Sequence, residues 1–421
     1  MTAGATDETA GTGAEDPTAT GTTAGTTLPL LRAGRRYASR DGVPVPGPAG
    51  TEIALSLAPE IMIRDDAARL RAARDGLPPL PAAERVALLR EATRLFRHGR
   101  VPVPGLGEQD PGGFAAAMAA CAGLPAALVG RWSALLDEHA SRLRPEEPDD
   151  GALTLVSLPA NTFTCLEAVL DAALTSGAVW IRPSRREPLA SARLAGALLA
   201  AGWPAGRIGY YPTAPAVLPA LVRETTRQIV YGGPDLAARM GGPRPSLDLR
   251  GPGRACLVAD ATPADPEGLA LRLAGLAAAD AGRFCTSVCI VAVAGDAEPV
   301  ARALAARFDA ISLDPPDPRL PQASCPEADA LATARLLDGA LAAGGRVLTR
   351  RPLVNGTGGR AFLAPTVVLV EDPGHPLVGR ELPFPFVVAV STDAAGVRGV
   401  ASRSRFVHHE PSAPLPEGTF H

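Results

Sequence analysis

Apolar positions recur with helical spacing in the first third of the chain. Within residues 80–98, Leu88, Ala92 and Leu95 follow one another at intervals of four and three residues, which predicts an amphipathic helix. A second helical region covers residues 114–143 and is interrupted at 123–125 by Gly-Leu-Pro, a sequence that ends helices. The first third is therefore expected to be mainly helical.

From residue 153 onward, short apolar runs alternate with helical patterns. The expected strands are 153–158, 178–181, 207–211, 228–231, 256–259, 288–294 and 386–390, and the expected helices are 163–175, 188–201, 217–223, 266–279, 300–308 and 330–343. This alternation predicts mostly parallel sheets with helices on both faces. Strands this apolar are expected to be buried on both sides, and ligands of such sheets bind at the carboxyl ends of the strands.

Composition narrows the function classes. The 421 residues are 46% hydrophobic and 20% charged, which is typical of a globular protein with two or three domains. A net charge of -3 gives no reason to expect a nucleic-acid or membrane partner. The chain contains no lysine, which excludes Schiff-base and P-loop lysines. Residues 1–27 lack a basic start and an apolar run, so a disordered tail and a cytoplasmic protein are expected.

One of the six cysteines stands out by its place in the pattern. Cys285, in Asp280-Ala-Gly-Arg-Phe-Cys285, falls in the connection between an expected helix and an expected strand, where a thiol is accessible and Arg283 could hold it as a thiolate. The alternative is a small apolar core residue, the usual role of a free cysteine. That role is assigned to Cys121, Cys165, Cys256 and Cys289. No histidine lies near Cys285 and Cys289, so no metal site is expected.

Polar groups and glycines follow three of the expected strands. Asn161 could donate to a developing oxyanion or cap a helix. Arg182, Ser184 and Arg185 could bind a phosphate or ribose, or could form a solvated loop. The Gly-Gly-Pro run at 232–234 could admit a phosphate at a helix start or form a plain turn. The residues alone leave these alternatives open.

Taken in order, these segments resemble the aldehyde dehydrogenase superfamily over residues 50–390. The motifs that carry the resemblance are Leu158-Pro-Ala-Asn161, Ile181-Arg-Pro-Ser184, Ile229-Val-Tyr-Gly-Gly233, Asp280-Ala-Gly-Arg-Phe-Cys285 and Glu381-Leu-Pro-Phe384. The resemblance implies an α/β fold with a Rossmann-type cofactor domain at 28–246 and an α/β catalytic domain at 247–390. A short segment, 391–421, is expected to return to the cofactor domain. The resemblance is compatible with a homodimer.

The resemblance also implies roles for individual residues. Cys285 would attack a carbonyl carbon, Asn161 and a backbone N–H near Cys285 would hold the oxyanion, and Asp248 stands where the family has its glutamate base. Glu381 would hold the nicotinamide ribose. The full set of residues expected along the dinucleotide is Pro159, Arg182, Ser184, Arg185, Gly232, Gly233, Pro234, Glu381 and Phe384.

Departures from the family pattern refine the expectation. Asp248 is one methylene shorter than glutamate, and a weak hydrolytic base favours exchange with a thiol such as coenzyme A or a carrier-protein thiol. Arg182 replaces the family's lysine and Arg185 a position that is often acidic, which favours NADP over NAD. We therefore expect interconversion of an aldehyde and an acyl thioester, as in the acyl-CoA reductases. The alternatives are hydrolytic oxidation to a carboxylic acid, and a degenerate member that acts as a binding subunit.

Overall fold

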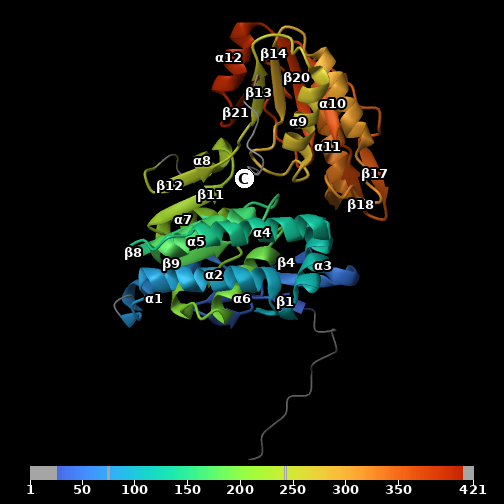
Figure 1. Cartoon of the computed structure of the whole chain (residues 1–421). Coiled ribbons are helices and arrows are strands. Elements are labelled where there is room, and N and C mark those ends of the chain that lie inside the picture. The colour runs from blue at the N-terminus through green and yellow to red at the C-terminus, as the bar shows by residue number, and fades with distance from the viewer. Residues whose placement is uncertain (1–25, 74–75, 241, 243, 411–421) are drawn as a thin grey trace, which may run out of the picture.

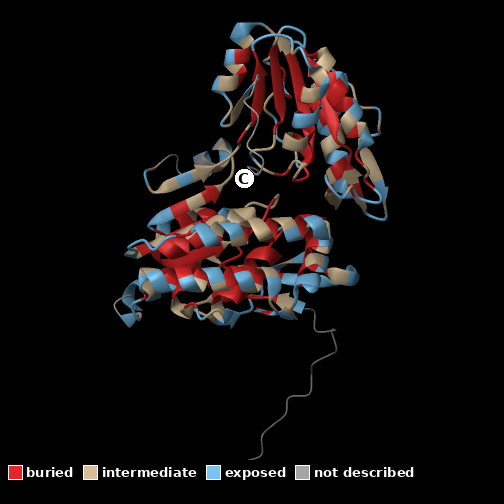
Figure 2. Cartoon of the chain, in the orientation of Figure 1, coloured by how far each residue is buried: buried red, intermediate tan, exposed pale blue. Residues whose placement is uncertain are grey.

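The computed structural model describes residues 26–410 except 74, 75, 241 and 243. Two α/β units follow one another along the chain, each built around its own sheet (Figure 1). In both units the central strands of the sheet are buried (Figure 2). The sequence pattern predicted this arrangement, and the mixed α/β class is confirmed.

The first unit contains a seven-stranded sheet in the order β12-β11-β8-β9-β10-β2-β3. Its strands are β2 Leu30–Arg32, β3 Arg35–Tyr37, β8 Asp149–Ser157, β9 Ser176–Arg182, β10 Ile208–Tyr210, β11 Arg227–Tyr231 and β12 Leu247–Arg250. The five strands from β12 to β10 are parallel. The chain order reverses between β8 and β11, which creates the crevice where doubly wound sheets bind their ligands.

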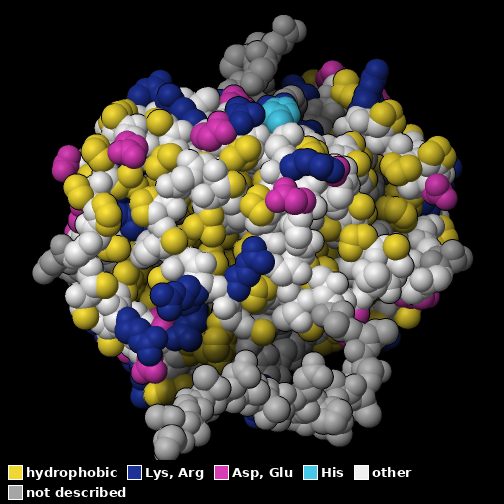
Figure 3. All heavy atoms as spheres, turned by 90° about the horizontal axis from the view of Figure 1, so that it is seen from below, with side chains coloured by type: hydrophobic (Ala, Val, Ile, Leu, Met, Phe, Trp, Pro, Cys, Tyr) yellow, Lys and Arg dark blue, Asp and Glu magenta, His cyan; other side chains and the backbone are white. Residues whose placement is uncertain are grey.

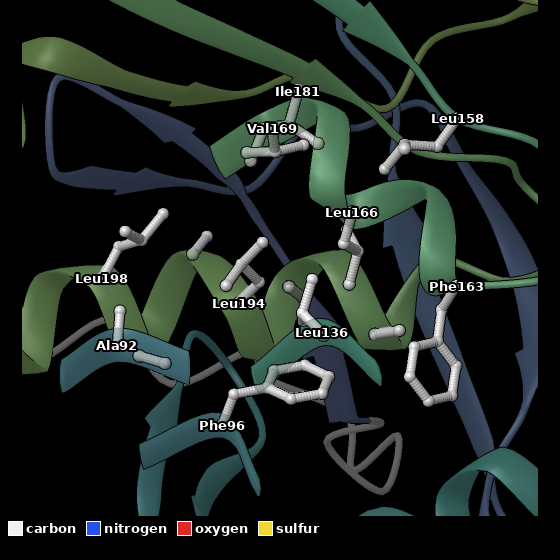
Figure 4. Close-up of a cluster of buried hydrophobic side chains, with 14 of the residues drawn as sticks. Ala92, Phe96, Leu136, Leu158, Phe163, Leu166, Val169, Ile181, Leu194 and Leu198 are labelled. Atoms are coloured by element: carbon white, nitrogen blue, oxygen red, sulfur yellow. The ribbon is translucent and has the colours of Figure 1, made fainter. Parts of the chain in front are cut away.

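Helices cover both faces of this sheet. They are α1 Glu60–Ala73, α2 Ala82–His98, α3 Pro111–Ala122, α4 Ala126–Arg142, α5 Glu167–Thr175, α6 Leu189–Ala200, α7 Leu218–Glu224 and α8 Pro234–Arg239. Alternate strand residues point to opposite faces, so Val156 and Ile181 pack with α2, α4, α5 and α6 (Figure 4). Leu155 and Trp180 pack on the other side with α1 and α7. The break between α3 and α4 lies at Gly123, as predicted.

The second unit contains a six-stranded sheet in the order β16-β19-β20-β14-β13-β21. Its strands are β13 Cys256–Ala259, β14 Ile290–Ala294, β16 Arg346–Val347, β19 Thr366–Val370, β20 Phe386–Thr392 and β21 Val407–Glu410. The helices are α9 Pro266–Ala278, α10 Glu298–Ala310, α11 Glu327–Leu341 and α12 Ala394–Ser402. Leu257 and Val291 pack against α9 and α10, whereas Val258 and Ile290 pack on the face that α11 and α12 cover.

The described part of the chain also contains three small sheets. They are formed by β1 Thr26–Leu28, β4 Gly42–Pro46 and β5 Glu52–Ser56; by β6 Val101–Val103 and β7 Gly107–Gln109; and by β15 Ser324–Pro326, β17 Val354–Thr357 and β18 Arg360–Leu363. The sequence pattern did not predict these short strands. Of the tail expected at 1–27, residues 1–25 lie outside the described part, while Thr26 and Thr27 belong to β1.

Two expectations about domain organisation are wrong. The segment from residue 391 does not return to the first unit as far as residue 410, because α12 packs on β13, β14 and β20 and β21 pairs in parallel with β13. The sequence-based boundary at residue 247 also falls too early. Strand β12, at 247–250, still pairs with β11 in the first sheet.

The outer face of the first unit, seen in Figure 3, mixes basic, acidic and hydrophobic side chains. Several arginines gather toward one edge of that view, next to acidic side chains. In the described part of the chain, no single helix is long and apolar enough to cross a membrane; α3 and α4 pass that test only when taken together, with a bend of 111° between them.

Candidate active site

A tight turn after α9 presents Cys285. The chain leaves α9 through Ala281 and Gly282, both with positive φ (54° and 65°). A side chain at Gly282 would lie 2.5 Å from the carbonyl carbon of Phe384, so glycine is required where the turn touches residues 384–385. All six cysteines lie in the described part of the chain, and Cys285 alone is exposed. The prediction of an accessible thiol is confirmed, and we call residues 280–287 the nucleophile segment.

Cys285 borders a cavity of about 220 Å³ between the two units. Asn161 lines it from the first unit, and Glu381 and Phe384 line it from the segment before β20. The Asn161 Nδ2 donates one hydrogen bond to the carbonyl oxygen of Arg283 at 2.6 Å, which leaves its second N–H for another acceptor. The structure thus brings together four of the residues that the sequence selected.

The linker between the units, residues 251–255, joins three distant segments at this cavity. A Cβ at Gly253 would lie 1.9 Å from the carbonyl oxygen of Cys285, so only glycine fits against the nucleophile segment. The Gly253 carbonyl accepts the Arg405 N–H at 2.8 Å, and the Arg254 N–H donates to Oε1 of Glu381 at 2.6 Å. The linker therefore fixes Glu381, Cys285 and the segment around Arg405 relative to one another.

The surroundings of Cys285 disfavour its thiolate. Burial of the sulfur among neighbouring chain atoms raises the pKa of Cys285, and the charge of Glu381 raises it further, whereas Arg405 lowers it. The expected help from Arg283 is wrong, because its buried guanidinium donates to the carbonyls of Ala122 and Ser324 instead. The thiol therefore needs a ligand or a change in its surroundings to become a strong nucleophile.

We expect Glu381→Gln to lower the pKa of the Cys285 thiol. The amide keeps an oxygen for the Arg254 N–H but removes the negative charge that disfavours the thiolate. Alkylation of Cys285 by iodoacetamide, followed by mass spectrometry across pH, should therefore be faster near neutral pH than in the wild type. Asp248→Asn is the matched control and should leave the profile unchanged. Identical pH profiles for wild type and Glu381→Gln would contradict the assignment.

Asp248 does not reach this cavity. It lies on β12 and is not among the residues that line the space beside Cys285. Its carboxylate accepts a hydrogen bond from Nε of Arg250 at 2.8 Å, in an ion pair that is about half exposed. Residues two apart on a strand share a face, so Arg250 lies close enough to form this ion pair with the Asp248 carboxylate. The structure thus does not bring the expected base and the thiol together.

Aromatic side chains support the nucleophile segment from the first unit. Trp132 of α4 is fully buried, and its Nε1 donates to Oδ1 of Asp280 at 2.9 Å. Its ring lies 5.4 Å from that of Phe284, next to Cys285, and 5.4 Å from that of Phe163. The sequence pattern did not single out Trp132, because only the fold places α4 against a segment about 150 residues away.

A second cavity, of about 210 Å³, opens at the carboxyl ends of β8, β9 and β11. Arg182 lines it, and its guanidinium donates to hydroxyls of Thr213 (2.8 Å) and Ser157 (3.2 Å). No carboxylate is among the residues described along its walls. Burial lowers the pKa of Arg182 to about 10, with a smaller contribution from the charge of Arg185. This half-buried cation, with no acidic partner among the described residues of the cavity wall, fits an anionic or hydroxyl-rich ligand.

The other residues expected along a dinucleotide surround this crevice without lining the second cavity. Pro159 follows β8, and Ser184 Oγ accepts the Arg186 N–H in the loop after β9, where Arg185 is exposed. Gly232 follows β11 and donates its N–H to the carbonyl of Arg250, Gly233 comes next, and Pro234 begins α8. In the part of the chain that the structure describes, no three His, Cys, Asp or Glu side chains are grouped to hold a metal ion.

Two charged residues that affect the Cys285 thiol were not predicted from the sequence. Arg405 lies between α12 and β21, and its charge favours the Cys285 thiolate. Glu167 begins α5, is half-buried, and disfavours that thiolate. Neither belongs to a recognisable motif, and no local pattern connects residues 120 positions apart, so no signal in the sequence could have identified them.

The comparisons with known proteins rest on structure alone. No protein-family model matches the sequence, and no curated protein matches it. A NAD-dependent benzaldehyde dehydrogenase from Corynebacterium glutamicum is similar in structure, with a TM-score of 0.74 at 18% identity over 91% of this chain and 89% of that chain. A 1-pyrroline-5-carboxylate dehydrogenase from Thermus thermophilus (R100A mutant) gives a TM-score of 0.71 at 18% identity over 92% and 81%.

A third solved structure is an NADP-dependent glyceraldehyde-3-phosphate dehydrogenase from Bacillus halodurans C-125 complexed with NADP. Its TM-score is 0.70 at 18% identity, over 91% of this chain and 90% of that chain. These proteins share the two α/β units, and the nucleophile segment, Asn161 and Glu381 meet between those units. The chain therefore has the fold of the aldehyde dehydrogenases, with a Rossmann-type unit followed by a second α/β unit.

Proposed function

We propose that the protein is an NAD(P)-dependent oxidoreductase of the aldehyde dehydrogenase type that interconverts an aldehyde and an acyl thioester. The observation that carries this proposal is the placement of the single exposed thiol, Cys285, in a cavity with the Asn161 amide. The names of the structural neighbours, which include NAD- and NADP-dependent aldehyde dehydrogenases, support it.

Two residues of the cavity, Cys285 and Asn161, have parts in the proposed reaction. After the Cys285 thiol loses its proton to solvent, the thiolate adds to the aldehyde carbon, and the oxyanion of the resulting hemithioacetal accepts a hydrogen bond from the second N–H of Asn161. When bound, the nicotinamide supplies the hydride acceptor, and loss of hydride from the hemithioacetal carbon leaves a thioester on Cys285. An incoming thiol then attacks the carbonyl carbon of that thioester and takes the acyl group, and the sulfur of Cys285 leaves as a thiolate.

Thiol exchange is favoured over hydrolysis because the cavity lacks a free base. Among the described residues that line it, Glu381 is the sole carboxylate, and its Oε1 already accepts the Arg254 N–H. Asp248 is held by Arg250 outside the cavity. A hydrolytic aldehyde dehydrogenase needs a carboxylate that can activate water at the thioester, and this second candidate function has less support.

The charges around Arg182 favour NADP. Arg182 and Arg239 line the second cavity, which has no acidic residue among its described lining, and Arg185 is exposed nearby. A 2′-phosphate would find cations there, whereas the carboxylate that would accept hydrogen bonds from the ribose hydroxyls of NAD is missing from that lining. Coenzyme A or a carrier-protein thiol is the proposed acyl acceptor.

Aldehyde and NADP without a thiol should give a burst of about one NADPH per enzyme and then stop. The burst reports acylation of Cys285, and the thioester persists because no free carboxylate is among the described residues that line the cavity. Adding coenzyme A should restore steady turnover, and NADPH with an acyl-CoA should run the reverse reaction. The measurement is rapid-mixing absorbance of the nicotinamide, with NAD run in parallel.

Two results would decide against this proposal. Steady NADPH formation without thiol, with a carboxylic acid as product, would establish the hydrolytic reaction. The absence of both a burst and dinucleotide binding across a panel of aldehydes would favour the binding-subunit alternative. Asp248→Asn is the control, and its burst should match that of the wild type.

A further inference from the structure

A third and larger cavity lies on the other side of the nucleophile segment. Its volume is about 430 Å³, and it shares Phe284 and Ser287 with the cavity of Cys285. Its other walls come from α4, the carboxyl end of α9 and residues 405–408. A space of this size is typical of small-molecule sites, and its shared wall is formed by residues on either side of Cys285 in the nucleophile segment.

Two arginines and one aspartate line this cavity. Asp280 is its sole described acidic residue, and it accepts hydrogen bonds from Trp132 and Arg131. Arg131 and Asp280 therefore compensate each other. Arg405 also lines the cavity, and no acidic side chain lies within ion-pair distance of it among the described residues. One cation is left without a counter-charge.

Neutral donors accompany that cation. Thr286 and Ser287 line the same cavity with hydroxyl groups, and His408 lines it from β21. Burial lowers the pKa of His408 and so favours the neutral imidazole, which can donate one N–H. An exposed guanidinium that shares a cavity with hydroxyl and imidazole donors, and whose acidic neighbour there is paired with another arginine, suits an anion such as a carboxylate or phosphate.

We propose that Arg405 binds an anionic group of the substrate in this cavity while Cys285 attacks the carbonyl carbon. The inference rests on the proposed function, because it assigns the substrate class of that same site. The anion is either a carboxylate on the acyl chain or a phosphate on the thiol carrier. Both would meet the same guanidinium, and the experiment separates them.

Protection of Cys285 from iodoacetamide tests the inference without any turnover. Glutarate is compared with its neutral diamide, and S-methyl-4′-phosphopantetheine with S-methylpantetheine. In the wild type, one of the two anions should slow alkylation at least about threefold more than its neutral analogue. Arg405→Gln should abolish this difference and Arg405→Lys should restore part of it. Protection is taken as a ratio within each variant, because Arg405 itself affects the thiol.

The matched control is Arg403→Gln, since Arg403 lies two residues away, donates to the carbonyl of Pro373 and does not line the cavity. It should protect like the wild type. Protection by glutarate alone places the anion on the acyl chain, and protection by the phosphate alone places it on the carrier. Equal effects of anion and neutral analogue in the wild type, or unchanged protection in Arg405→Gln, would overturn the inference.

Turnover gives the second readout. If glutarate protects and so places the anion on the acyl chain, a four-carbon aldehyde with a terminal carboxylate is compared with its methyl ester. The ratio of the two kcat/KM values should then fall about tenfold or more in Arg405→Gln. The burst with the methyl ester should remain. If the wild type shows no burst but glutarate or the phosphate still protects through Arg405, the anion site stands and the proposed reaction fails, so the two hypotheses are separable.

Discussion

Cys285→Ala should lose at least about 10³-fold in turnover with any aldehyde or acyl thioester. The reason is chemical: without the sulfur neither the hemithioacetal nor the acyl-enzyme can form. No other cysteine can replace it, because Cys165 and Cys325 are half-buried and the remaining three are buried. Burial also raises the pKa of Cys165 and of Cys289 to about 12, so neither supplies a thiolate at neutral pH.

Cys289→Ala is the control for this loss. It removes a buried thiol four residues further on and should keep the burst. Dinucleotide affinity, measured by calorimetry, should be unchanged in Cys285→Ala, because Arg182 and its cavity lie at the carboxyl ends of the first sheet. A Cys285→Ala protein that turns over at a rate near that of the wild type would refute covalent catalysis by this residue.

The fold was predictable wherever local periodicity determines the element. Strand β13 falls on residues 256–259 as expected, and α2 begins two residues after the expected start. Strands of three residues, such as β1, contain too few positions for a period. Strand β21 has the sequence Val-His-His-Glu, without an apolar alternation, and is a strand because it pairs with β13 about 150 residues earlier. That pairing is what places the C-terminal segment in the second unit.

The candidate site was predictable in part for a similar reason. Asn161, Cys285 and Glu381 each lie in a short motif beside a strand. Asn161 follows β8 of the first sheet, and Cys285 and Glu381 precede the parallel strands β14 and β20 of the second, so each falls at an end of a sheet where such sites are found. Asp248 also lies in a motif, but its orientation depends on Arg250, its neighbour on the same strand face. Arg405 and Gly253 lie in no motif, and only the packing of the linker connects them to Cys285.

Phe163→Ala should destabilise the first unit by about 3–5 kcal/mol. The ring is 2% exposed and stands among three other aromatic rings, with centroids 5.9 Å from Phe96, 5.7 Å from Phe114 and 5.4 Å from Trp132. Figure 4 shows Phe163 and Phe96 within this core. Its removal leaves a cavity and also forfeits three edge or tilted ring contacts. Phe163→Leu, which keeps most of the apolar volume, should lose clearly less.

Urea unfolding followed by tryptophan fluorescence measures the loss of stability of the first unit. The chain has three tryptophans, and Trp132, Trp180 and Trp203 are all buried in the first unit, so the signal reports that unit. A midpoint equal to that of the wild type would show that the aromatic cluster is not a stabilising core.

The Phe163→Ala substitution should also slow acylation in the fraction that remains folded. Asn161 lies two residues before Phe163, and Trp132 packs between Phe163 and Phe284. The ring that stabilises the first unit therefore also holds both the oxyanion donor and the nucleophile segment in place.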